Sequence, residues 1–150
     1  DNVDVDAATR QGVVVCNAHL EPANINALTD AVEAAREQGA RVSFPDVTRK
    51  PHALRLGDEF KSGACHAGRY EGSLVMAASP FLARREIAES LEPNPASLSK
   101  AIKEGKQTFA DAGGPRAYFG WPADATEAEG DELYDVLADI FATAAAELLR

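Results

Sequence analysis

The spacing of hydrophobic positions in the first third of the chain predicts a strand, a helix and a second strand. Residues 12–16, "GVVVC", form a short apolar run without alternation, which is typical of a strand buried on both faces. In residues 25–39, Ile25, Leu28, Val32 and Ala35 recur at helical spacing. Gly39 follows them where a C-terminal cap is preferred. "RVSF" at 41–44 is the second strand, so this region predicts a parallel βαβ unit.

Two further helices are predicted in the rest of the chain. Residues 68–78 form the first, with Leu74, Val75 and Ala78 on its buried side. Residues 126–150 form the second, which begins with a capping box of Thr126 and Glu129. Its apolar stripe comprises Leu133, Val136, Leu137, Ile140, Ala144 and Leu148. Between the elements, residues 45–65, 91–100 and 110–126 are rich in Gly or Pro and predict loops, and residues 1–11 are a polar leader.

Charge and composition exclude several classes of function. The 150 residues carry 24 acidic against 15 basic side chains, a formal net charge of −9, and the basic ones are scattered. Phosphate binding needs clustered Lys and Arg, so we expect no nucleic-acid partner. No apolar run is long enough to span a bilayer, and the acidic start lacks the basic region of a signal peptide. Cys16 and Cys65 form no C-x-x-C pair, which favours reduced thiols in a cytoplasmic protein.

Two loops carry side chains suited to chemistry. His19 and Glu21 lie two residues apart in the loop after the first strand, where ligands bind in open α/β sheets. They could ligate a metal ion, although a lone loop histidine is more often a hydrogen-bonding residue. His66 and Glu71 flank a small-residue loop at the start of a helix. His66 is either a general acid/base or a hydrogen-bonding residue at the helix start, and Glu71 is also favoured there by the helix dipole.

Three stretches together resemble the creatininase (creatinine amidohydrolase) family. Residues 66–80, "HAGRYEGSLVMAASP", resemble its H-A/G-G-x-x-E-T-S-L signature. Residues 13–24, "VVVCNAHLEPAN", resemble its strand and N-G-H loop, and residues 117–134 resemble a stretch near its C-terminus. The matches follow the family's order and cover the chain from about residue 12 to residue 150.

The resemblance implies both a fold and an activity. The fold would be a three-layer α/β/α sandwich with a mainly parallel sheet, and residues 12–150 would supply its C-terminal half. The activity would be hydrolysis of a cyclic amide or a related C–N bond other than a peptide bond, at a site with two divalent ions (Zn or Mn). Carried over, His19 and Glu21 would be metal ligands, His66 would give a proton to the leaving nitrogen, and Glu71 would orient either His66 or the substrate. Such enzymes usually form homo-oligomers, often hexamers.

The sequence also departs from the family pattern. Ala18 replaces the glycine before the ligand histidine, Gly72 replaces a threonine, and Trp121 stands in place of an aspartate. Ser62 occupies the position of a tryptophan in creatininase, which argues against creatinine as the substrate.

The ligand set is the largest departure. The family's remaining ligands, a Glu-x-His pair and a bridging Asp, precede the N-G-H loop, and residues 1–11 do not contain that pattern. Two ligands cannot hold two ions, because a catalytic zinc normally has three protein ligands. We therefore expect activity only with an N-terminal half, in a homo- or hetero-oligomer. That half would be a second polypeptide made by cleavage or separate coding, or a part of the protein outside residues 1–150.

Alternative functions remain open at this level. The scissile bond could instead be a formamide or a peptide bond, or the chain could be a non-catalytic structural or partner subunit that retains the fold. A generic small-molecule binding module would require no metal. Tyr118, Phe119 and Trp121 lie in one loop and could either wall a substrate pocket or pack in an oligomer.

Overall fold

A computed structural model describes residues 14–15 and 22–149, and the side chains from residue 27 onward. Within these residues the chain divides into two compact units. Of the described residues, 14–15, 22–52 and 137–149 belong to unit 1, and 53–136 belong to unit 2. The predicted leader, residues 1–11, lies outside the described residues.

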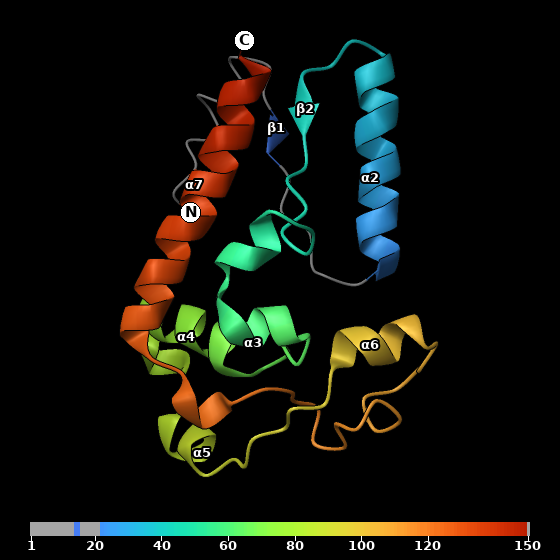
Figure 1. The fold of residues 1–150 in the computed structure, drawn as a ribbon. Helices are drawn as coiled ribbons and strands as arrows, with labels where there is room; N and C mark the ends of the chain where they lie inside the picture. Colours follow the sequence, from blue (N-terminus) through green and yellow to red (C-terminus); the bar gives the residue numbers. More distant parts are fainter. Residues whose placement is uncertain (1–13, 16–21, 150) are drawn as a thin grey trace. The chain divides into compact units, whose positions relative to one another are not determined.

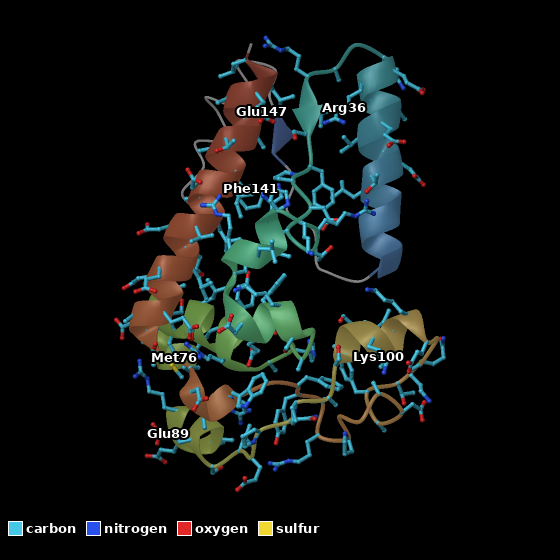
Figure 2. All side chains as sticks on the ribbon, viewed as in Figure 1. Arg36, Met76, Glu89, Lys100, Phe141 and Glu147 are labelled. Carbon is cyan, nitrogen blue, oxygen red and sulfur yellow. The ribbon has the colours of Figure 1, made fainter. Side chains whose placement is uncertain are left out.

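Unit 1 contains the predicted βαβ unit. Strand β1 (Val14–Val15) pairs in parallel with β2 (Val42–Ser43), Val14 opposite Val42. Helix α2 (Pro22–Glu37) connects them and lies alongside β2 (Figure 1). Figure 2 shows Arg36 of α2 on the side facing β2, where its Nε donates to the Val42 carbonyl at 2.9 Å. The α/β character is therefore confirmed, whereas the described residues form a two-stranded sheet and the predicted three-layer sandwich stays a prediction.

The end of α2 confirms the role predicted for Gly39. Its backbone has φ +85°, a conformation that favours glycine. The Gly39 N–H donates to the Arg36 carbonyl at 2.9 Å, and the Ala40 N–H donates to the Ala35 carbonyl at 3.0 Å. These two bonds form a Schellman motif, which satisfies carbonyl groups that the helix leaves unpaired.

Unit 2 is built from short helices, and the start of α7 belongs to it. In chain order its elements are η1 (His52–Arg55, of which His52 belongs to unit 1), α3 (Gly57–Ser62), α4 (Arg69–Ala78), η2 (Pro80–Leu82), α5 (Arg85–Glu89), α6 (Leu98–Lys103), η3 (Pro122–Asp124) and α7 (Glu127–Leu148). Helices α4 and α7 confirm the helices predicted at residues 68–78 and 126–150. Helix α3 was not predicted, because residues 45–65 were interpreted as a loop. None of the described helices combines the length and apolar composition needed to cross a bilayer.

The buried face of α4 differs from the prediction. Tyr70, Ser73 and Met76 are buried, whereas Val75 is 42% exposed and Ala78 is exposed. The reason is the close approach of α7: a Cβ on Gly130 would lie only 2.7 Å from the Ser73 carbonyl carbon. The small serine therefore faces α7, where its Oγ also donates to Glu129. The predicted stripe of α7 is confirmed, with Leu133 and Ile140 almost fully buried.

Candidate active site

His66 is held by backbone pairing with Phe119. The Phe119 N–H donates to the His66 carbonyl at 2.7 Å, and the His66 N–H donates to the Phe119 carbonyl at 3.4 Å. The imidazole packs on the Phe109 ring with centroids 4.6 Å apart, and Phe109 packs edge-on against Phe119, which is fully buried. The ring is half-buried, so it keeps access to solvent or to a ligand while its backbone is fixed.

Glu71 stabilises the turn that follows His66. Its Oε2 accepts a hydrogen bond from the Ala67 N–H at 2.7 Å. Ala67 has φ +49°, a conformation that L-residues rarely adopt. Glu71 is the third residue of α4, and a carboxylate there also interacts favourably with the helix dipole. The structure thus brings His66 and Glu71 to one loop, and the carboxylate is engaged with the backbone of that loop.

A third carboxylate, Glu59 of α3, lies under the same loop. Its Oε2 accepts from the Arg69 N–H and the Trp121 N–H, each at 2.7 Å, and its Oε1 accepts from the Tyr70 N–H at 2.8 Å. The residue is 7% exposed. The N-cap position of α4 is Gly68, which has no side chain to cap the helix, and Glu59 replaces that function from a separate helix.

The sequence interpretation missed Glu59 because it lies in the unpredicted helix and belongs to no motif. The one indication of Glu59 in the sequence is indirect: two glycines stand where a side chain would collide with its carboxylate. A Cβ on Gly68 would lie 2.6 Å from Glu59 Oε2, and one on Gly120 would lie 2.5 Å from Glu59 Cδ. Gly120 also has φ +96°.

The starts of α4 and α7 are joined by a polar network. Glu129 Oε2 accepts from Arg69 Nε at 2.6 Å and from Ser73 Oγ at 3.0 Å. Ser73 Oγ in turn accepts from the Thr126 N–H at 3.0 Å. The predicted capping box is half confirmed: the Glu129 N–H donates to Thr126 Oγ1 at 3.2 Å, while the Glu129 carboxylate is used across the helix pair instead.

Cys65 precedes His66 and is a poor nucleophile in this setting. Burial raises the pKa of its thiol, and the nearby Glu59 and Glu71 carboxylates raise it further. A thiol reacts as its thiolate, so the environment keeps Cys65 in the unreactive form. Cys65 forms no disulfide within the described residues, and Cys16 lies outside them, so the reduced state of both thiols stays a prediction.

The aromatic loop is held mainly through its backbone. Tyr118 Oη donates to the Glu92 carbonyl at 2.7 Å, and Asn94 Nδ2 donates to the Tyr118 carbonyl at 2.9 Å. The Asn94 and Gly120 backbones pair as an antiparallel bridge. The aromatic residues of this loop were predicted either to wall a substrate pocket or to pack in an oligomer. Phe119 does neither on its own surface, because its ring is fully buried in the core of unit 2.

Comparison with known proteins decides the family. The family model for creatininase, described as creatinine amidohydrolase, matches residues 5–145, which is nearly the whole chain. The chain belongs to the creatininase family. The resemblance found in the sequence is thereby confirmed, and no curated protein and no solved structure matches the chain.

Creatininase family members are amidohydrolases that generally bind a divalent metal. The predicted ligands His19 and Glu21 lie outside the described residues, so their geometry is untested. Among the residues that the structure describes, no group of three or more His, Cys, Asp or Glu side chains is placed to hold an ion. The described residues therefore do not form a metal site by themselves. The part of the candidate site that they contain is the loop that carries His66 and Glu71.

Proposed function

We propose that the chain is part of a metal-dependent amidohydrolase of the creatininase type that cleaves a cyclic amide or a related C–N bond. The observation that carries the proposal is the placement of His66. It stands at the histidine of the signature that residues 66–80 resemble, and two backbone hydrogen bonds pair it with Phe119 while the residue keeps partial exposure. A positioned imidazole is the usual group for moving a proton near neutral pH.

His66 is assigned as the general acid that gives a proton to the departing nitrogen. Ring packing on Phe109 limits the rotation of the imidazole, which keeps its nitrogens in a narrow range of directions. Glu71 is assigned as a positioning residue, because its Oε2 holds the Ala67 N–H in the turn directly after His66. The alternative role of Glu71, orienting the substrate, is less favoured because one of its oxygens is already engaged.

The metal would be held by His19 and Glu21 together with further ligands. An imidazole and a carboxylate suit Zn or Mn, and two such donors are fewer than one catalytic ion normally takes. A bound ion of this kind would supply Lewis acidity and an activated water. We propose that the other ligands come from a second polypeptide segment, which would complete both the site and the three-layer α/β/α sandwich in a homo- or hetero-oligomeric assembly. The environment would be the cytoplasm.

The test combines native mass spectrometry, elemental analysis and three histidine variants. His66→Ala should remove most turnover on a panel of cyclic amides and leave metal content unchanged, since its role is proton transfer. His19→Ala should lower metal content and turnover together. The matched control is His52→Ala, which changes the remaining histidine at a half-buried position in η1 and should alter neither.

The outcomes separate the candidate functions. Two Zn or Mn ions per complete site together with hydrolysis of a cyclic amide would support the proposal. Hydrolysis of formamides or peptides alone would favour the alternative within the family. A protein without metal, whose His66→Ala and His19→Ala variants behave as wild type, would contradict the proposal and favour a structural subunit.

A further inference from the structure

Glu59 is a buried carboxylate whose hydrogen bonds go to the main chain of two separate segments. Its three donors are the N–H groups of Arg69, Tyr70 and Trp121, all at 2.7 to 2.8 Å. A carboxylate this deeply buried is costly unless it is hydrogen-bonded, and charge-assisted bonds of this length are strong. Two of the donors lie at the start of α4, where the helix dipole also favours a negative charge.

The two segments that Glu59 joins are the ones that flank His66. Arg69 and Tyr70 follow the turn that begins at His66, and Trp121 comes two residues after Phe119, the backbone partner of His66. Glu59 therefore fastens the chain on both sides of the His66–Phe119 pair. Loss of the Glu59 carboxylate would therefore weaken hydrogen bonds in both segments next to the His66–Phe119 pair.

Glycines at the contact points allow this approach. Gly68 and Gly120 both lack the Cβ that would collide with the carboxylate, as the distances above show. A Cβ on Gly120 would also lie 2.6 Å from the Ala64 carbonyl. The two glycines and Glu59 thus form one closely packed unit, which leaves the carboxylate little freedom to move.

We infer that Glu59 is a positioning residue for the reaction, holding the His66 loop and the Trp121 segment in a fixed relation so that the imidazole stays aligned. The inference rests on the proposed function for the role of His66 in proton transfer. The contacts of Glu59 themselves do not depend on that function. A purely structural role would predict lower stability on substitution without any change in the His66 environment.

The test variant is Glu59→Gln, which keeps size and shape and removes the charge. Its amide oxygen can still accept from Arg69 and Trp121, but these bonds lose the charge that strengthens them. Its NH2 group then faces the Tyr70 N–H, so two donors oppose each other. The matched control is Asp58→Asn, because Asp58 is the neighbouring acidic residue, is exposed and pairs with Lys61 at 3.0 Å. Glu59→Asp keeps the charge with a shorter reach and serves as the second variant if Glu59→Gln does not fold.

Three readouts are expected to move together in Glu59→Gln. Hydrogen-exchange protection of the Arg69, Tyr70 and Trp121 amides should fall roughly 10- to 100-fold, and that of the Schellman-motif amide at Ala40 should not change. The His66 ring resonances should shift in NMR spectra, since the packing on Phe109 alters. In the complete assembly, on the cyclic amide that the wild type hydrolyses best, kcat should fall about 10- to 100-fold with little change in KM.

Each possible result decides the inference. Unchanged His66 resonances in a folded Glu59→Gln that has lost amide protection would overturn it, and so would an Asp58→Asn that shifts them equally. If neither variant of Glu59 lowers protection at the three amides, the inference also fails. If the wild type, assayed in its complete assembly with the second polypeptide segment, hydrolyses no cyclic amide while protection and His66 resonances respond as expected, Glu59 positions His66 and the proposed amidohydrolase function is the part that fails.

Discussion

Replacing Gly130 with alanine tests the packing between α4 and α7. Gly130 is buried in the first turns of α7, directly against the backbone of Ser73. An added Cβ would lie well under 3.0 Å from the Ser73 carbonyl oxygen and 2.7 Å from the Ala77 Cβ. The main obstacle is backbone, which cannot move aside as the end of a long side chain can.

Two opposing effects set the magnitude. Alanine is favoured over glycine inside a helix by about 1 kcal/mol. Forcing an extra methyl group into a well-packed contact costs about 1 to 3 kcal/mol, and a clash with a carbonyl oxygen belongs at the upper end. We therefore expect Gly130→Ala to lower the free energy of unfolding by about 2 kcal/mol, which corresponds to a fall in Tm of roughly 4 to 8 °C for a chain of this size.

Thermal unfolding followed by circular dichroism measures this directly. Gly72→Ala in α4 is the matched control, because its Cβ would meet only the Ala125 Cβ at 3.0 Å, where a small shift gives relief. Its change in Tm should be close to zero or positive. A Gly130→Ala protein as stable as the wild type would refute the close approach of the two helices.

Two other expectations concern unit 2. Burial is the main cause that raises the pKa of both Cys65 and Tyr70 above their ordinary values of 9.0 and 10.0. Above pH 9 the unfolded state loses these protons while the folded state keeps them, so the free energy of unfolding is greatest below pH 9 and falls as pH rises. The urea midpoints at pH 8 and pH 10.5 should therefore differ less in a Cys65→Ser, Tyr70→Phe protein than in the wild type. An equal fall of the midpoint in both proteins would contradict the assignment. Asn94→Ala removes side-chain bonds to Gly113, Tyr118 and Ala96 and should lower the free energy of unfolding by about 1 to 3 kcal/mol. Asn94→Asp keeps the Ala96 bond but turns a carboxylate oxygen toward the Gly113 and Tyr118 carbonyl oxygens, so urea unfolding should show at least as large a loss.

Long periodic segments could be predicted from the sequence, and short ones could not. Helices α2 and α7 repeat their apolar positions over several turns, and Gly39 ends α2 by a local conformation that glycine favours. Helix α3 has six residues, which is too short for a period to show. Pro45, Pro51 and Gly57 therefore predict a loop in this stretch, although α3 forms there.

The candidate site divides in the same way. His66 and Glu71 could be predicted because one short motif contains both. Glu59 could not, since its partners are backbone N–H groups that become neighbours only after folding. The prediction of the buried face of α4 was wrong for a related reason. Ser73 is buried because it contacts Gly130 and bonds to Glu129, and the hydrophobicity of residues along α4 cannot predict such contacts.

The three bonds of Glu59 span very different lengths of chain, and this has a consequence for the order of folding. The donors Arg69 and Tyr70 are 10 and 11 residues from Glu59, and Trp121 is 62 residues away. Closing the longer loop carries an additional entropic cost of roughly 1.5 kcal/mol. The contact between α3 and α4 can therefore form early and locally, while the Trp121 bond waits until residues 80 to 120 have been ordered. A nascent chain released before residue 121 would leave the Glu59 carboxylate one partner short, so the loop around His66 acquires its final geometry only after residue 121 has been synthesised.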